Sequence, residues 1–154
     1  MPVEVRYVAD TSAFINSWTL LYPMRRFAPF WDRFDGLISE GALRSPWEVF
    51  EEIKRKADDL HDWVKSRREV FVPIDDDQQH HVSRIVNHYR GMLATGHNAA
   101  DPWVVALAKS LSATVVTEEK PVSLAKGKMP DVCAAEDVAC LNVLGMIDAE
   151  DWNF

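Results

Sequence analysis

Carboxylates follow apolar segments at several points of this sequence, and such groups can hold a hard cation. Asp10 comes directly after the β-branched and aromatic run Val5–Ala9. Glu118 and Glu119 come directly after the similar run Ala113–Thr117. Mg²⁺ and Mn²⁺ take oxygen ligands, which carboxylates supply. An ion held in this way can activate a water molecule and orient a phosphodiester.

Each of these acids also has an ordinary structural interpretation. Asp10 can cap a helix, and Asp101, in the segment Ala-Ala-Asp-Pro-Trp, is a natural N-cap followed by proline at the first helical position. Glu118 and Glu119 can mark the exit from a strand into a loop, and Asp131 after Pro130 is equally ambiguous. Spacing alone leaves the structural and the metal-binding interpretations open.

Three further glutamates share one predicted helix. Ser45, Pro46 and Glu48 have the pattern of a helix start, with Ser45 as the N-cap and Glu48 as the capping-box acid. Glu52 lies one turn beyond Glu48 on the same face and can reach a site at the end of a sheet. Glu51 is the third acid of this helix, and as lone glutamates all three are typical of a solvated surface.

The elements that would position these acids alternate between strands and helices. The predicted strands are Val5–Ala9, Ala42–Arg44, Val70–Ile74, Ala113–Thr117 and Val138–Val143. The predicted helices are Ala13–Leu21, Phe27–Glu40, Pro46–Lys56, Asp58–Glu69, Trp103–Leu111, Pro130–Glu136 and Leu144–Ala149. A further helix is predicted to end at Tyr89, and the acids Asp75–Asp77 supply its N-cap. This alternation predicts βαβ units and a mainly parallel sheet, so the fold class is α/β. Ligands of such sheets bind at the carboxyl ends of the strands, where Asp10, Glu118 and Glu119 are expected.

Composition narrows the class of protein. The length of 154 residues fits one domain over residues 1–154. The net charge of −7 by itself argues against a nucleic-acid binder, although a whole-chain average can hide local basic patches. The sequence contains no apolar run long enough for a membrane span and no signal-peptide pattern, so a soluble, cytoplasmic protein without a membrane partner is expected.

Four segments in order resemble the PIN-domain nucleases, and most of all the VapC-like toxins of bacterial and archaeal toxin–antitoxin systems. They are Tyr-Val-Ala-Asp-Thr-Ser-Ala-Phe, Glu-Val-Phe-Glu-Glu-Ile, Ala-Asp-Pro-Trp-Val-Val-Ala-Leu-Ala and Val-Val-Thr-Glu-Glu-Lys. The resemblance covers nearly the whole chain. It implies a three-layer α/β/α sandwich with a mainly parallel sheet of four to five strands, and endoribonuclease activity on RNA with Mg²⁺ or Mn²⁺ as the cofactor.

The resemblance also implies roles for individual residues. The acids that match the catalytic and metal-binding positions are Asp10, Glu52, Asp101 and Glu119. Glu48 and Glu51 are near alternatives to Glu52, and Glu118 or Asp131 could replace Glu119. A glutamate stands at position 119 where the family often has an aspartate, which adds one methylene of reach. Thr11, Ser12 and Thr117 are expected to support the ligands.

Partners follow from the same resemblance. An RNA substrate needs cations near the carboxylates, and the candidates for phosphate contacts are Arg25, Arg26, Lys54, Arg55, Lys56, Arg67, Arg68 and Lys120. A cognate antitoxin should block the site with a basic side chain, and the many aromatics make a homodimer plausible. The rival hypothesis is a PIN-like module that binds RNA or protein without cutting. A DNA nuclease is disfavoured because the chain is short.

Overall fold

Five parallel strands form the centre of the structure, a computed structural model that describes residues 4–73, 75–93 and 99–154. The strands lie in the order β3-β2-β1-β4-β5, and every neighbouring pair is parallel. Their bounds are β1 Tyr7–Ala9, β2 Leu43–Pro46, β3 Phe71–Val72, β4 Thr114–Val116 and β5 Cys140–Leu141. The predicted α/β class with a mainly parallel sheet of four to five strands is confirmed.

The central strand β1 places the first acid of the predicted site. Val8 and Ala9 are fully buried, as expected for a strand covered by helices on both faces. Val8 pairs with Arg44 of β2 on one side and with Val115 of β4 on the other. Asp10 follows β1 directly and accepts a 2.8 Å hydrogen bond from the Ala13 N–H. It therefore caps the next helix, which was one of the two interpretations of this residue from the sequence.

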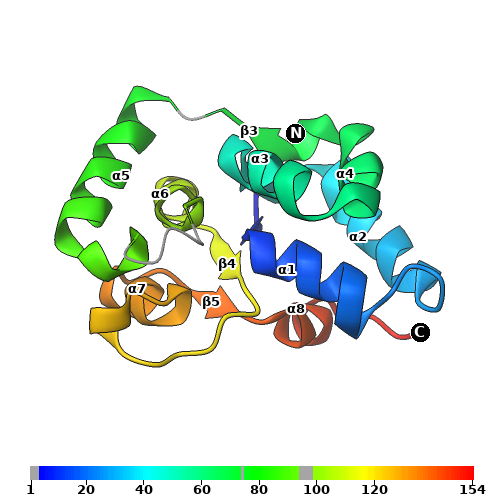
Figure 1. Cartoon of the computed structure of the whole chain (residues 1–154). Helices are drawn as coiled ribbons and strands as arrows, with labels where there is room; N and C mark the ends of the chain where they lie inside the picture. The colour runs from blue at the N-terminus through cyan, green and yellow to red at the C-terminus, as the bar shows by residue number, and fades with distance from the viewer. Residues whose placement is uncertain (1–3, 74, 94–98) are drawn as a thin grey trace.

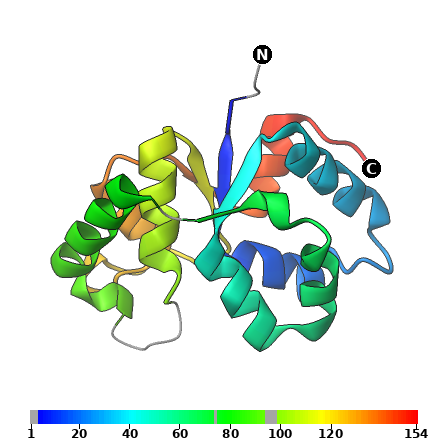
Figure 2. The same ribbon diagram turned by 90° about the horizontal axis from the view of Figure 1, so that it is seen from above.

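Helices cover both faces of the sheet, which confirms the three-layer sandwich (Figures 1 and 2). Their bounds are α1 Thr11–Asn16, α2 Ala28–Glu40, α3 Trp47–Lys56, α4 Asp58–Lys65, α5 Asp76–His88, α6 Asp101–Leu111, α7 Met129–Ala135 and α8 Val143–Glu150. Short turns of other types are the π-helical η1 Ser17–Leu21 and the 3₁₀ segments η2 Arg68–Val70, η3 Arg90–Leu93 and η4 Leu124–Lys126. Figure 2 shows α5 and α6 on one side of the sheet and α1, α2, α4 and α8 on the other. No helix within the described ranges has the length and apolar character to cross a bilayer.

The predicted start of the third helix is wrong. Ser45 and Pro46 belong to β2, where they pair with Phe71 and Val72 of β3, and α3 begins only at Trp47. The Ser45 hydroxyl donates a 2.7 Å hydrogen bond to the Ala9 carbonyl instead of capping the helix. Strand pairing has therefore overridden the local capping pattern.

Other element boundaries also differ from the prediction. The first residue of α6 is Asp101, and Ala100 takes the N-cap position that was predicted for the aspartate. The helix predicted over Asp58–Glu69 ends at Lys65, because the chain must turn there to bring β3 beside β2. Ile74, the end of the third predicted strand, lies outside the described residues.

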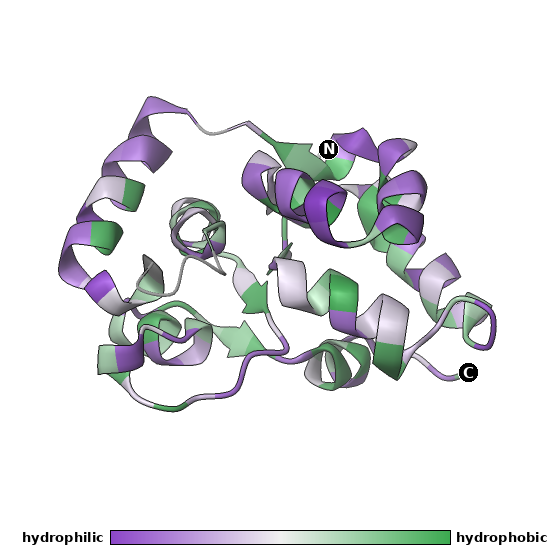
Figure 3. Ribbon diagram, in the orientation of Figure 1, coloured by the Kyte–Doolittle hydropathy of each residue, from purple (hydrophilic) through white to green (hydrophobic). Residues whose placement is uncertain are grey.

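The helices α3, α4 and α5 turn polar faces outward (Figure 3).

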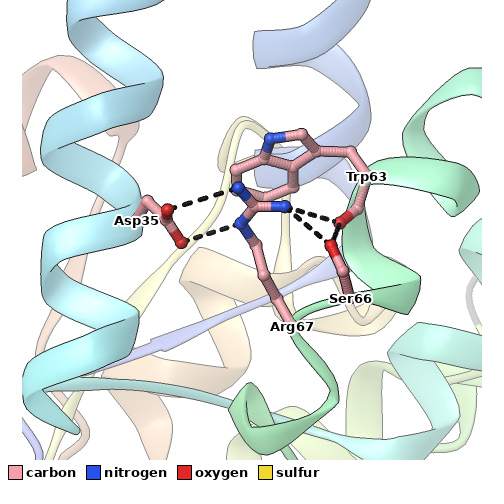
Figure 4. Close-up of polar contacts among 4 residues, drawn as sticks. All are labelled: Asp35, Trp63, Ser66 and Arg67. Atoms are coloured by element: carbon pink, nitrogen blue, oxygen red, sulfur yellow. Dashed lines mark hydrogen bonds and ion pairs between the residues drawn. The ribbon is translucent and has the colours of Figure 1, made fainter.

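An aromatic cluster joins α1, α2 and α4. Trp31 is fully buried, and Trp63 lies 5.0 Å from it between ring centroids. The Arg67 guanidinium lies 3.9 Å over the Trp63 ring and donates to both carboxylate oxygens of Asp35, at 2.7 and 3.2 Å (Figure 4). These contacts give Arg67 a structural role in joining α4 to α2, although the sequence offered it as a phosphate ligand.

Glu136, at the end of α7, joins this helix to α5 and α6 on one face of the sheet. Its replacement should lower the stability of the fold. Arg84 donates to both of its oxygens, at 2.6 and 3.1 Å, and the Tyr89 hydroxyl donates at 2.5 Å. The Lys109 ammonium donates to the Glu136 carbonyl at 2.8 Å. The hydrogen bonds from Arg84 lower the pKa of Glu136 to about 2, from an ordinary value of 4.5.

We expect Glu136→Gln to lower the free energy of unfolding by about 1–3 kcal/mol at neutral pH, because a charged partner of a buried network is lost. The pKa of Glu136 is depressed in the folded state. Its contribution is therefore complete above pH 4.5 and fades as the pH falls towards about 2. Urea unfolding across this range measures the gap between variant and wild type, with the exposed Glu69→Gln as the matched control. A gap that stays constant with pH contradicts the assignment.

Candidate metal centre

Three carboxylates from separate parts of the chain converge at the carboxyl edge of the sheet. Asp10 follows β1, Glu119 lies just beyond β4, and Asp101 is the first residue of α6. One oxygen from each of the three lies within 4.8 Å of the others. Asp10 and Asp101 are 1% and 4% exposed, and Glu119 is half-buried, so the cluster opens to solvent on the Glu119 side.

Hydroxyl groups fix the orientation of Asp10. The Thr117 hydroxyl donates to Asp10 Oδ2 at 2.5 Å, and the Ser12 hydroxyl donates to Oδ1 at 2.7 Å. The Ala13 N–H also donates to Oδ1, at 2.8 Å. The sequence predicted supporting roles for Ser12 and Thr117, and the structure brings both against Asp10. Thr11 was predicted with them, but its hydroxyl is buried and has no hydrogen-bond partner among the described residues.

The same two hydroxyls shape the chain after β4. Thr117 Oγ1 accepts the Glu119 N–H at 3.1 Å, and Ser12 Oγ accepts the Glu118 N–H at 3.0 Å. This turn sends neighbouring side chains to different places. Glu119 joins the cluster, and its Oε1 also accepts the Met129 N–H at 3.4 Å. Glu118 instead accepts the Val143 N–H at 2.8 Å, at the start of α8.

The three carboxylates are too close and too buried for all of them to carry a charge without a cation or protons. Burial raises the pKa of Asp10 to about 7, in spite of the hydrogen bonds from Thr117, Ala13 and Ser12. Burial, followed by the charges of Glu119 and Asp10, raises the pKa of Asp101 to about 10. The metal-free site therefore retains protons near neutral pH, and a divalent cation would replace them.

Glu52 lies close to the cluster but is not part of it. Its carboxylate is 2% exposed, and Oε1 accepts the Ala100 N–H at 2.6 Å. Lys56, one turn further along α3, lies 3.4 Å from Oε2. The negative charge of Glu52 is one of the causes that raise the pKa of Asp101. In the structure Glu52 therefore fastens α3 to the residue that precedes Asp101.

The other candidate acids lie outside the cluster. Glu48 is half-buried, and burial raises its pKa; its Oε2 has no hydrogen-bond partner in the described part of the chain. Glu51 is half-buried on the same helix. Asp131 Oδ2 accepts the Val122 N–H at 2.9 Å and so holds the loop after β4. Among the acids offered for the last position, the structure brings only Glu119 to the other two.

The predicted phosphate contacts are spread over the surface. Arg25 and Arg26 lie in the exposed turn between η1 and α2, and Lys54 and Arg55 are exposed near the end of α3. Lys120 is the candidate that directly follows the cluster. It lines a cavity of about 400 Å³ together with Glu118, Glu119 and Asn142.

The donor set fits a hard divalent cation. The three converging groups all offer carboxylate oxygens, and one of them, Glu119, also lines this cavity. Mg²⁺ is typically held by a few carboxylates while it retains several waters, so further protein ligands are not required.

Because neighbouring glutamates have different contacts, Glu119 and Glu118 form a matched pair for mutation. We expect Glu119→Gln to weaken Mn²⁺ binding by about tenfold or more, the scale seen even for residues that only support ligands. Glu118→Gln should leave the affinity unchanged, because the amide oxygen can still accept the Val143 N–H. Calorimetric titration measures both, and a larger effect of Glu118→Gln would show that the wrong glutamate has been assigned.

Comparisons with known proteins agree with this architecture. A family model described as "Domain of unknown function (DUF4411)" matches residues 7–154. The structure is similar to FitAcB from Neisseria gonorrhoeae, with 19% identity, a TM-score of 0.52, and coverage of 88% of this chain and 96% of that one. It is also similar to PAE2754 from Pyrobaculum aerophilum, with 16% identity, a TM-score of 0.52, and coverage of 96% and 97%. No curated protein matches the sequence. The fold is PIN-like, as the resemblance of the four segments implied.

Proposed function

The chain belongs to the DUF4411 family, and from the geometry of its acidic site we propose that it is a divalent-metal-dependent endoribonuclease. The observation that carries the proposal is the convergence of Asp10, Asp101 and Glu119 within 4.8 Å at the carboxyl edge of a PIN-like sheet. These residues come from three distant parts of the sequence. Local capping therefore does not explain why they meet.

The residues of the site have three different proposed roles: holding the cation, orienting a ligand and positioning α6. Asp10, Asp101 and Glu119 hold Mg²⁺ or Mn²⁺ through their oxygens. When bound, the ion activates water for attack on a phosphodiester and stabilises the charge that develops on the phosphate. Ser12 and Thr117 hold Asp10 in the orientation that its role requires, at the distances given above. Glu52 is a positioning residue that sets the start of α6 and adds negative charge.

RNA is the proposed substrate because of the fold and the charge layout together. The PIN-like fold resembles that of ribonuclease toxins, and Glu119 of the acidic cluster lines the same cavity as Lys120. A phosphate that approaches this cavity meets the Lys120 ammonium at the rim. Its charge is then balanced by a cation on the carboxylates, which would otherwise repel it.

We also propose that this nuclease is the toxin of a toxin–antitoxin pair in the cytoplasm. An antitoxin that inserts a basic side chain among Asp10, Asp101 and Glu119 would neutralise the site and exclude the cation. A homodimer is proposed as well, although all three aromatics of α2, Phe30, Trp31 and Phe34, are buried in the core and supply no exposed surface for it. Co-purification from the native operon and light scattering test these two partners.

The experiment that tests the activity is cleavage of a labelled single-stranded RNA by the purified protein. We expect cleavage with Mn²⁺ or Mg²⁺ and none with EDTA. Asp10→Asn should abolish it, while circular dichroism shows a folded variant. Cleavage at the wild-type rate by folded Asp10→Asn contradicts the proposal. RNA binding without cleavage by the wild type would favour the rival, a PIN-like module that holds RNA without cutting it.

A further inference from the structure

A second cavity lies between the end of α1, η1 and the junction of α3 with α4. Its volume is about 330 Å³, and its lining includes Ile15, Trp18, Lys56, Asp58 and Asp59. The lining combines an aromatic ring, an aliphatic side chain, an ammonium group and two exposed carboxylates. The aromatic ring suits a flat heterocycle, the carboxylates suit amino groups on its edge, and the ammonium group suits a phosphate.

The indole ring of Trp18 is held in place from behind. Its ring centroid lies 5.1 Å from that of Trp31, edge to face, and 6.0 Å from that of Trp63. Trp63 is itself clamped by Arg67, which binds Asp35 (Figure 4). Trp18 is thus half-buried and ordered before any ligand arrives, and little conformational entropy is lost when a base stacks on it.

The backbone around Trp18 is unusual in a way that fits a binding role. Trp18 lies in η1, a π-helical turn that continues α1, and such turns are frequent at functional sites. The Thr19 hydroxyl donates to the Ile15 carbonyl at 2.8 Å, which satisfies an acceptor in this widened turn. Ile15, Trp18 and Thr19, spaced as i, i+3 and i+4 across α1 and η1, line the same cavity.

Two consecutive side-chain contacts connect the lining of this cavity to the backbone beside the metal centre. Lys56 lines the cavity and lies 3.4 Å from Glu52. Glu52 in turn binds the N–H of Ala100, the neighbour of Asp101. Along α1, Trp18 lies seven residues beyond Thr11, which is roughly 10 Å at the helical rise. A nucleotide next to the scissile phosphate could therefore place its base in the cavity.

From these observations we propose that the cavity between Trp18 and Lys56 is a nucleobase subsite of the RNA-binding surface. The base of a nucleotide next to the scissile bond stacks on Trp18, and its phosphate contacts Lys56. Asp58 or Asp59 accepts a hydrogen bond from an exocyclic amino group, as carboxylates do with cytosine. This inference rests on the proposed ribonuclease function and names the side chains that recognise the substrate.

Abasic scanning tests the stacking directly. The probe is a labelled RNA hexamer in which each position in turn lacks its base. It is titrated by fluorescence anisotropy onto Asp101→Asn protein in EDTA, so that no cleavage is needed. We expect loss of one base to weaken binding roughly 5- to 100-fold. Adding Trp18→Leu should weaken binding of the intact hexamer similarly and remove the sensitivity to that base.

Further variants separate stacking from a folding defect. Trp18→Tyr keeps an aromatic platform and should restore most of the affinity, whereas Trp152→Leu, a half-buried tryptophan near the C-terminus, should leave the affinity unchanged. Lys56→Ala should lower the slope of log Kd against log salt by about 0.7, the loss of one phosphate contact on a single strand. Asp58→Ala with Asp59→Ala removes the acceptor oxygens and should erase a roughly fivefold preference for cytosine over uracil at the same position.

The outcomes distinguish this subsite from the ribonuclease function itself. If the wild type cleaves RNA but the abasic penalties are the same with and without the Trp18→Leu substitution in a folded protein, the subsite is overturned and the nuclease stands. If the penalty depends on Trp18 but the wild type cuts no RNA with Mn²⁺ or Mg²⁺, the subsite stands and the nuclease does not. RNA that fails to bind the folded protein both in EDTA and with Mn²⁺ or Mg²⁺ present overturns the subsite.

Discussion

Replacing Asp101 by asparagine should have two opposite effects, a loss of RNA cleavage by at least about 100-fold and a gain in the stability of the metal-free protein. The loss follows because Asp101 is one of three groups that converge on the proposed cation, and removal of one electrostatic stabiliser of a transition state commonly costs this much. The gain follows from the proton that wild-type Asp101 carries in the folded state.

The sign of the stability change comes from the pKa. Burial and the neighbouring carboxylates raise the pKa of folded Asp101 to about 10, from an ordinary 3.8. Between these values the wild type takes up a proton when it folds, so its stability falls as the pH rises. Asparagine needs no proton. The variant should therefore exceed the wild type in free energy of unfolding in EDTA, by about 0.5–2 kcal/mol, and the gap should widen with pH.

Thermal melts in EDTA and a cleavage assay with Mn²⁺ measure the two effects on the same preparations. Asp131→Asn is the matched control, because Asp131 holds the Val122 N–H rather than the cluster, and an amide oxygen can still accept that bond. It should keep its activity and its melting temperature. Full activity in Asp101→Asn, or a fall in its metal-free stability, would refute the assigned role.

The affinity for Mn²⁺ should rise steeply with pH. The cation must displace protons from a site in which the pKa of Asp10 is about 7 and that of Asp101 about 10. Each displaced proton changes the apparent affinity roughly tenfold per pH unit below the pKa of its group. Calorimetry in two buffers of different ionisation enthalpy counts these protons, and an affinity that does not change with pH would contradict the coupling.

The hydroxyls around Asp10 give a variant for the same experiment. The hydrogen bond from Thr117 lowers the pKa of Asp10, against the effect of burial. Thr117→Val removes this bond, so the pKa of Asp10 should rise and Mn²⁺ binding should require a higher pH. Ser110→Ala, a change remote from the cluster on α6, should leave the pH profile as it is.

The sequence predicts those acids whose position is set by a single element. Asp10 is recognisable because a short apolar run ends at it, and Asp101 because Asp-Pro precedes an apolar helix. In both cases the residue type, the element and the edge of a parallel sheet follow from local pattern. The four segments that resemble PIN-domain nucleases correctly implied the layers and the parallel sheet.

The remaining features depend on contacts between elements. Glu118 and Glu119 are equivalent in sequence, and they separate only because Ser12 and Thr117 bind the backbone of the turn. Ser45 has every local mark of a helix cap, yet pairing with β3 draws it into a strand.

The role of Glu52 also depends on contacts between elements that the sequence does not reveal. Its sequence position suggests a metal ligand, but its bond to the Ala100 N–H depends on how α3 packs beside α6. Trp18 carries no motif at all. It becomes a candidate only when η1 and α3 are seen to enclose one cavity with Lys56.

The most direct test of the central claim is a calorimetric titration of Mn²⁺ into the wild type and into Asp101→Asn, above neutral pH. We expect saturable binding to the wild type, tighter than millimolar and accompanied by proton release, and no binding to the folded variant. A folded wild type whose titration is indistinguishable from that of Asp101→Asn would contradict the claim that Asp10, Asp101 and Glu119 form a metal centre.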